Sequence, residues 1–155
     1  MKEIILTNGK ICLVDDKDFD ELSQFNWYET QCGYAKRHKR IEGKLTSIFM
    51  HRVVINAVKG QIVDHINRNP LDNRKENLRI SDKSTNAMNR GKQKNSTSGY
   101  KCVYHDKRNN TFDAYITAKG KRKFLGSYKT AIEAAKAYNE FAIKLHGEFA
   151  NLNEV

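Results

Sequence analysis

The chain has 155 residues, and its 28 lysines and arginines outnumber its 18 aspartates and glutamates, which gives a net charge of +10 and a pI near 9.5. A balance this basic favours a polyanionic partner such as nucleic acid, although ribosomal, chromatin and membrane-surface proteins share it. No apolar run approaches the roughly twenty residues that a bilayer-spanning helix needs, and the N-terminus lacks the apolar core of a signal peptide, so we expect a cytoplasmic protein with no membrane partner.

The three cysteines, Cys12, Cys32 and Cys102, lie far apart and form no Cys-x-x-Cys pair. The sequence therefore predicts neither a disulfide framework nor a zinc ribbon. We interpret all three as reduced, partly buried side chains.

The first fifty residues predict a hairpin, a short helix and a basic strand. Residues 2–16 form two β-prone runs around Asn8-Gly9, a dipeptide typical of tight hairpin turns. Residues 18–29 predict a short helix that runs into a strand carrying the only tryptophan, Trp27. Residues 33–40 then place basic side chains close together, and we expect them to contact a nucleic-acid backbone: Lys36, Arg37 and Arg40, with Lys39.

His51 lies in the largely apolar segment 47–55, and two interpretations of it stay open. A histidine in such a segment is more often a packed, hydrogen-bonded core residue. Alternatively, it supports a neighbouring catalytic group or contacts phosphate.

Residues 62–89 hold the most informative pattern of the chain. Residues 62–65 are β-prone, 68–75 are rich in loop formers, 77–80 predict a return strand, and 83–89 predict a short helix that Ser81 or Asp82 caps. Asp64 and His65 are adjacent at the end of the first strand. Asn77 follows His65 by twelve residues and Asn86 follows it by twenty-one.

These residue types suit metal-assisted hydrolysis. Asp64 offers a carboxylate oxygen and Asn86 an amide oxygen, both hard ligands, so the donor set favours Mg²⁺ or Mn²⁺ over zinc. An unperturbed histidine has a pKa of about 6.5, which suits His65 to abstract a proton near neutral pH.

The adjacent Asp-His pair and the two spaced asparagines resemble the HNH endonuclease family, and in particular its phage- and intron-borne homing enzymes. The resemblance implies a ββα-metal site that hydrolyses phosphodiester bonds of double-stranded DNA with one divalent ion per active site. It makes His65 the general base, Asp64 and Asn86 the metal ligands, and Asn77 the residue that holds the loop and orients the His65 ring. The family often has histidine where this chain has Asn86, and asparagine there still supplies an oxygen.

The positive charge is concentrated around this segment. Residues 1–28 carry a net charge of −3, residues 29–95 of +9, and residues 96–155 of +4. We therefore expect further DNA contacts beside the predicted site, from Arg74 and Arg79.

The polar run 90–98 predicts a linker, and the pattern beyond it predicts a sheet backed by a helix. Three β-prone segments, 100–105, 111–117 and 121–128, are separated by turn formers. Residues 129–148 then place small and apolar side chains at three- and four-residue steps along one helical stripe. That stripe consists of Ala131, Ala134, Ala135, Tyr138, Ala142 and Leu145.

Residues 98–153 resemble the ethylene-response-factor (APETALA-two-like) DNA-binding domain. The matching marks are FDAYI, FLGSY, EAAKAYNEFA and HGEFANLN. The resemblance implies that the outward face of the sheet enters the DNA major groove. Strand alternation places Phe112, Ala114 and Ile116 on the helix side and leaves Asp113, Tyr115 and Thr117 outward. The expected DNA contacts are Tyr104, Tyr115, Thr117, Arg122 and Phe124, with phosphate contacts from Lys101, Arg108, Lys119, Lys121 and Lys123.

The sequence thus predicts an α+β protein with a nuclease domain at 1–90 (core motif 51–90), a linker at 91–98 and a DNA-binding domain at 99–155. The predicted function is metal-dependent DNA cleavage by a monomer or weak dimer in a bacterial or phage-infected cell. A DNA-binding protein without catalysis is the alternative. An RNA-binding protein, whose outward aromatic rings stack on unpaired bases, is a third interpretation.

Overall fold

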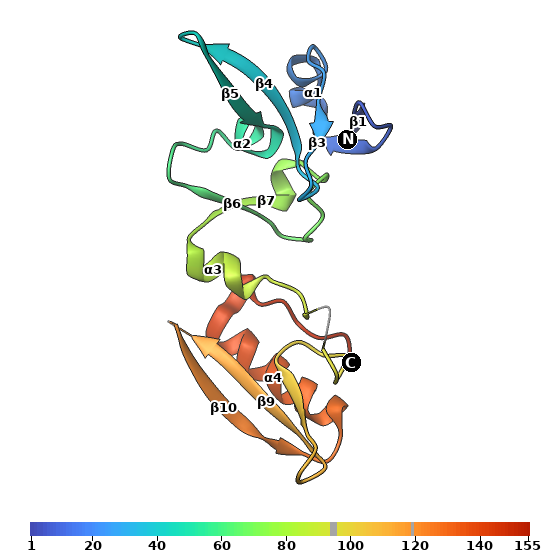
Figure 1. Ribbon diagram of the computed structural model, residues 1–155, viewed down its shortest axis with the longest axis vertical. Coiled ribbons are helices and arrows are strands. Elements are labelled where there is room, and N and C mark those ends of the chain that lie inside the picture. The colour runs from blue at the N-terminus through green and yellow to red at the C-terminus, as the bar shows by residue number, and fades with distance from the viewer. Residues whose placement is uncertain (94–95, 119) are drawn as a thin grey trace. The chain divides into compact units, whose positions relative to one another are not determined.

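The computed structural model describes residues 1–93, 96–118 and 120–155, and these form two compact units, Met1–Asp82 and Lys83–Val155 (Figure 1). The division comes before the predicted helix at 83–89, not after it. That helix belongs to the second unit because it contacts the C-terminal 3-10 helix there. The predicted domains at 1–90 and 99–155 divide the chain by function, and that division stays a prediction. Lys94 and Asn95 of the predicted linker, and Lys119, lie outside the described residues.

The first unit contains three small antiparallel sheets, β1-β2, β3-β4-β5 and β6-β7, within its described residues. Its elements in chain order are β1 (Lys2–Ile5), β2 (Ile11–Val14), α1 (Asp16–Leu22), β3 (Tyr28–Glu29), β4 (Ala35–Ile41), β5 (Lys44–Phe49), α2 (Met50–Val54), β6 (Ile62–His65), the 3-10 helix η1 (Lys75–Asn77) and β7 (Leu78–Ser81).

The Asn8-Gly9 hairpin is confirmed. β1 pairs antiparallel with β2, and Gly9 has a φ of 81°, a left-handed conformation that glycine adopts without steric cost. Trp27 was predicted inside a strand, but it lies just before β3, almost fully buried, and its indole N–H donates to the Leu22 carbonyl at 2.8 Å. This hydrogen bond ties the end of α1 to the core of the first unit.

The hairpin β6-β7 carries the motif that the sequence singled out. β6 spans the predicted residues, while β7 starts at Leu78 because Asn77 closes the turn of η1. The register sets Asp64 opposite Arg79 and His65 opposite Leu78. Two strands and then the helix α3 (Lys83–Met88) thus follow one another in the predicted order.

The second unit confirms the predicted sheet backed by a helix. Its strands β8 (Val103–Asp106), β9 (Thr111–Ala118) and β10 (Lys121–Tyr128) form an antiparallel sheet in the order β10-β9-β8. α4 (Ala131–His146) packs along one face of this sheet, and η2 (Gly147–Phe149) follows it (Figure 1). The start of α4 has a capping box, in which Thr130 and Glu133 each bond the other's backbone N–H.

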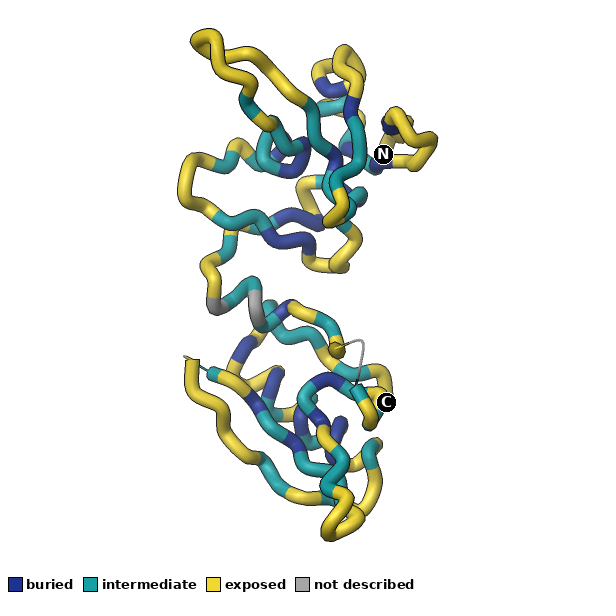
Figure 2. The backbone as a smooth tube through the Cα atoms, viewed as in Figure 1, coloured by how far each residue is buried: buried dark blue, intermediate teal, exposed yellow. Residues whose placement is uncertain are grey.

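Side-chain alternation on β9 follows the prediction. Ala114 and Ile116 of β9 are buried against α4, whereas Thr117 is exposed. On the neighbouring strand β10, residues 121–124 are also exposed (Figure 2). The predicted helical stripe is corrected at its end: Leu145 is exposed, and the buried residue is His146. None of the helices in the described ranges combines the length and apolarity needed to span a bilayer.

Candidate active site

Asp64 and His65 end β6 and are both buried. Asp64 lies opposite Arg79 in the hairpin, and its Oδ2 accepts from Arg79 Nε at 2.9 Å and from Arg79 Nη2 at 2.8 Å. The arginine side chain is only 12% exposed, so this ion pair is shielded from bulk water. Two bonds from one guanidinium to one oxygen fix the orientation of the carboxylate.

Asn73, which the sequence did not single out, contacts the His65 ring. His65 Nε2 lies 3.3 Å from Asn73 Oδ1, while Asn73 Nδ2 donates to Cys12 Sγ at 2.9 Å. Because the amide nitrogen is used on the sulfur, the amide oxygen faces the ring and accepts from Nε2–H. In the neutral ring the lone pair is then on Nδ1, the nitrogen that can take a proton.

Burial is the main influence on the protonation of His65. It lowers the pKa of His65 below the ordinary value, while the hydrogen bond to Asn73 and the carboxylates of Asp64 and Asp72 act in the opposite direction. A ring with a lowered pKa is neutral at physiological pH and can act as a base.

His65 belongs to a cluster of four aromatic rings, called the ring cluster and defined as Tyr34, Phe49, His51 and His65. The His51 ring lies 5.3 Å from the His65 ring and 5.0 Å from the Tyr34 ring, between ring centroids. His51 is buried, and burial lowers its pKa to about 3. Its Nδ1 has no hydrogen-bond partner among the described residues. His51 is therefore a packed core residue that also lies directly beside the predicted base.

Asn77 holds the loop between β6 and β7. Its Oδ1 accepts from the backbone N–H of Asn67 at 2.9 Å, and its Nδ2 donates to the Asp72 carbonyl at 2.7 Å. The sequence predicted that Asn77 would hold this loop and also orient the His65 ring. In the structure, Asn73 contacts the His65 ring, and Asn77 makes the hydrogen bonds that hold the loop.

Asn86 lies within α3 and is partly exposed. α3 belongs to the second compact unit, whereas Asp64 and His65 belong to the first. Within the described ranges, no group of three or more His, Cys, Asp or Glu side chains gathers as a metal cluster. The predicted metal site has one carboxylate and one amide oxygen as its protein ligands, so it does not require such a cluster.

The predicted basic patch on β4 is divided by the strand. Successive side chains of a strand point to opposite faces, so Arg37 lies on the other face from Lys36 and Arg40. The Arg37 guanidinium stacks 3.8 Å from the Phe25 ring centroid, while Arg40 is exposed. Lys36 lies over the Tyr28 ring at 5.4 Å.

The two arginines predicted to bind DNA beside the site are paired with carboxylates. Arg74 makes two bonds to Asp72, at 2.8 and 2.7 Å, and another to Glu76. Arg79 binds Asp64 as described above. Both guanidinium groups thus hold the site's own acidic side chains in place.

The outward face of the second unit's sheet brings most of its predicted contact residues together. The Arg122 guanidinium lies 3.8 Å from the Tyr115 ring centroid and 4.6 Å from that of Tyr104. Phe124 is 52% exposed, and its ring lies 5.3 Å from Tyr115. Thr117 pairs with Arg122 across the strands. Arg108 is exposed in the turn between β8 and β9.

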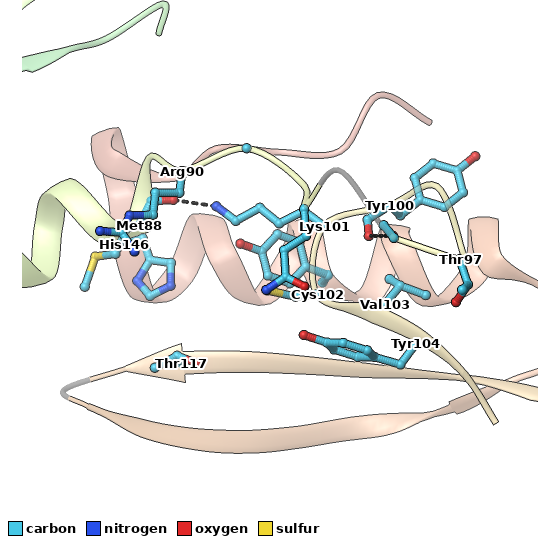
Figure 3. A pocket seen from close by; sticks show the side chains of 14 residues that line it. Met88, Arg90, Thr97, Tyr100, Lys101, Cys102, Val103, Tyr104, Thr117 and His146 are labelled. Carbon is cyan, nitrogen blue, oxygen red and sulfur yellow. Dashed lines mark hydrogen bonds between the residues drawn. The ribbon is translucent and has the colours of Figure 1, made fainter. Parts of the chain in front are cut away.

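Lys101 differs from these surface residues because it is buried. Its ammonium donates to the Met88 carbonyl at 2.5 Å, and it lines a pocket of about 600 Å³ within the second unit (Figure 3). The predicted phosphate contact is thus engaged with the protein's own backbone.

Sequence reasoning missed Asn73, Cys12 and Tyr34. Asn73 is one of several asparagines in a loop, and nothing in the sequence marks it as fully buried. Cys12 and Tyr34 are distant in sequence and reach the site only through tertiary packing.

Comparisons with known proteins support the resemblance to HNH endonucleases. A family model for HNH endonucleases matches residues 49–88, which include Asp64, His65, Asn77 and Asn86. A protein of Acanthamoeba polyphaga mimivirus, named "Uncharacterized HNH endonuclease L560", is 29% identical over 153 residues, 95% of this chain and 76% of that protein. "Protein 3.8" of Escherichia phage T7 is 33% identical over 92 residues, 59% of this chain and 75% of that protein. No solved structure matches. Residues 49–88 thus match the HNH endonuclease family, and the similarity to the mimivirus protein extends over most of the chain.

Proposed function

We propose that the protein is a metal-dependent DNA endonuclease of the homing or nicking type, which hydrolyses phosphodiester bonds in double-stranded DNA. The observation that carries this proposal is the buried His65, next to Asp64 and hydrogen-bonded through Nε2 to Asn73, inside the segment that matches the HNH endonuclease family.

His65 supplies the base in this proposal. With Nε2–H donated to Asn73, Nδ1 accepts the proton of a water molecule, and the resulting hydroxide attacks phosphorus in line with the departing 3′ oxygen. The products are a 5′ phosphate and a 3′ hydroxyl. One such site cuts one strand, so a monomer nicks, and a double-strand break needs a weak dimer or two successive events.

Asp64 and Asn86 fit a hard divalent cation, Mg²⁺ or Mn²⁺, because they offer one carboxylate and one amide oxygen and nothing soft. When bound, the cation would stabilise the charge that develops on the phosphate and on the departing oxygen. Arg79 orients the Asp64 carboxylate from one side through its Oδ2.

The second unit would grip the DNA as an ethylene-response-factor-type domain. Its outward sheet face combines an arginine with exposed or partly exposed aromatic rings, namely Arg122, Tyr104, Tyr115 and Phe124. Arg108, Arg40 and Lys36 would add phosphate contacts, which need only charge and reach. The protein would act in the cytoplasm of a bacterial or phage-infected cell.

A supercoiled-plasmid assay with Mg²⁺, Mn²⁺ or EDTA tests the proposal, with the wild-type protein beside His65→Ala. We expect metal-dependent nicking by the wild type and none by the variant, while both still shift the plasmid in a gel. Equal nicking by the two proteins would exclude His65 as the base.

A DNA-binding protein without catalysis is the second candidate, and one observation favours it. Asp64 already has a strong partner in Arg79, and such a pair stabilises a fold whether or not a metal binds. If both proteins bind the plasmid and neither cuts it, with phage or host genomic DNA as a further substrate, this alternative replaces the nuclease.

A further inference from the structure

The C-terminal end of α3 is held by two polar side chains from distant parts of the second unit. Lys101 Nζ donates to the Met88 carbonyl at 2.5 Å (Figure 3). Asn151 Nδ2 donates to the carbonyls of Asn89 at 3.1 Å and Arg90 at 2.9 Å. The last carbonyls of a helix have no partner inside it, and a cation near them also interacts favourably with the helix dipole.

The backbone of Lys101 is itself held by the chain's C-terminal segment. The Lys101 backbone N–H donates to Asn153 Oδ1 at 2.6 Å, and Asn153 Nδ2 donates to the Lys101 backbone carbonyl at 3.2 Å. Asn153 in turn exchanges two hydrogen bonds with Asn139 of α4, at 2.7 and 2.8 Å. A continuous hydrogen-bonded path therefore runs from α4 through Asn153 and Lys101 to the end of α3. We call Lys101, Asn151 and Asn153 the clasp.

α3 needs such support because it has only six residues. A helix much shorter than about twelve residues is not stable by itself in water and depends on tertiary contacts. Asn86 lies two positions before Met88, whose carbonyl Lys101 binds, so the clasp fixes the turn that carries Asn86.

We propose that Lys101 is a positioning residue of the nuclease, which holds α3 so that Asn86 can serve as a metal ligand. This inference rests on the proposed function, in which Asn86 binds the cation. It gives Lys101 a different role from the phosphate contact that the resemblance implied, because its ammonium is buried and bonded to backbone carbonyls.

The test compares Lys101→Met with Lys121→Met in the full chain. Lys101→Met keeps an unbranched apolar stem and removes the ammonium, while Lys121 is exposed on β10 and was predicted to contact phosphate. Mn²⁺ affinity is measured by calorimetric titration, DNA affinity in EDTA is measured against salt concentration, and hydrogen exchange follows the amides of α3. Thermal unfolding checks that each variant folds, and Lys101→Arg tests rescue by a longer cation.

For Lys101→Met we expect Mn²⁺ affinity to fall by roughly 10- to 100-fold, as when a residue supporting a metal ligand is lost. The α3 amides should exchange faster, the salt slope of DNA binding should stay at the wild-type value, and Lys101→Arg should recover part of the affinity. For Lys121→Met we expect Mn²⁺ affinity to be unchanged. The slope of the logarithm of DNA affinity against the logarithm of salt concentration should become shallower by roughly 0.9, the value for one lost phosphate contact.

A folded Lys101→Met protein with wild-type Mn²⁺ affinity and wild-type exchange in α3 would overturn the clasp. A reduced salt slope without a change in metal affinity would restore the phosphate-contact role. A wild-type chain that binds no Mn²⁺ and cuts no DNA would instead refute the proposed function, and the inference would fall with it.

Discussion

Asn73 connects the candidate base to the core of the first unit through a single amide. Its oxygen faces His65 Nε2, and its nitrogen donates to the buried Cys12. Burial raises the pKa of Cys12 to about 11, so the thiol stays protonated and the sulfur is a neutral acceptor. The amide thus has one orientation, and that orientation selects the His65 tautomer whose lone pair is on Nδ1.

We expect Asn73→Ala to lower the cleavage rate by roughly 100-fold, because the His65 ring loses the group that fixes its tautomer and angle. DNA affinity in EDTA should be unchanged. Single-turnover plasmid nicking is the measurement, with Asn69→Ala as the control, since Asn69 lies in the same loop and, among the described residues, its side chain bonds only the Leu71 N–H. A wild-type rate for Asn73→Ala would show that the ring is oriented by another contact.

His51 makes stability dependent on pH. Its folded-state pKa of about 3 lies below the ordinary value of 6.5, so between these pH values the unfolded chain binds a proton that the folded protein does not. Its contribution is therefore present above the unfolded pKa and is lost as the pH falls toward the folded pKa.

We expect the wild type to lose on the order of 2 kcal/mol more stability than His51→Phe between pH 7 and pH 4.5, at about 1.4 kcal/mol per pKa unit. Urea unfolding at both pH values measures the difference. The comparison with the variant removes the effect of the carboxylates, which titrate in both proteins. Parallel pH profiles for the two proteins would mean that His51 is not the titrating group.

At the scale of elements, the turn before β4 brings Tyr34 into the ring cluster. Gly33 has a φ of 86°, and its N–H donates to the Thr30 carbonyl at 2.8 Å. A Cβ at this position would lie 2.8 Å from Cγ of Pro70, in the loop that follows His65. The turn and that loop therefore pack so closely that position 33 has no room for a Cβ atom.

We expect Gly33→Ala to destabilise the protein by roughly 2–4 kcal/mol, from the left-handed backbone and the contact with Pro70 together. Gly9→Ala is the matched control, because Gly9 has a similar φ of 81° but open space around it. It should cost about 1–2 kcal/mol, the backbone contribution alone. Urea denaturation of both variants gives the comparison, and equal losses would show that Pro70 moves aside.

At the scale of the whole molecule, the HNH segment 49–88 continues across the boundary between the two compact units, at Asp82 and Lys83. The hairpin β6-β7, which carries Asp64 and His65, belongs to the first unit, while α3 belongs to the second unit with the C-terminal sheet and helix. The boundary between the compact units therefore lies within the HNH segment, before the polar run at 90–98.

We expect deletion of residues 98–155 to lower both DNA affinity and the single-turnover cleavage rate at saturating DNA, because the deletion removes the clasp as well as the outward sheet face. Titration of DNA at low salt separates the two effects. A truncated protein that reaches the full rate once DNA is saturating would show that the second unit adds affinity alone.

Local patterns in the sequence predicted most of the elements, because each depends on nearby residues. The Asn8-Gly9 turn, the alternation along β9 and the small-residue stripe of α4 are all visible within a few residues of one another. The adjacent Asp64 and His65 with two spaced asparagines likewise predicted the similarity to HNH endonucleases that the family model finds over residues 49–88, since the spacing of a motif is a property of the chain itself.

Tertiary structure alone decided which partners these residues have. Asn73 meets Cys12 across 61 positions of the chain, and Lys101 reaches a helix end that the sequence assigned to another domain. Charge in the sequence predicted arginines and lysines that contact DNA, and the structure adds that Arg74, Arg79 and Lys101 bind carboxylates and carbonyls of the protein. The physical reason is that a buried charge requires a partner, and which partner lies within reach is set only when distant segments pack together.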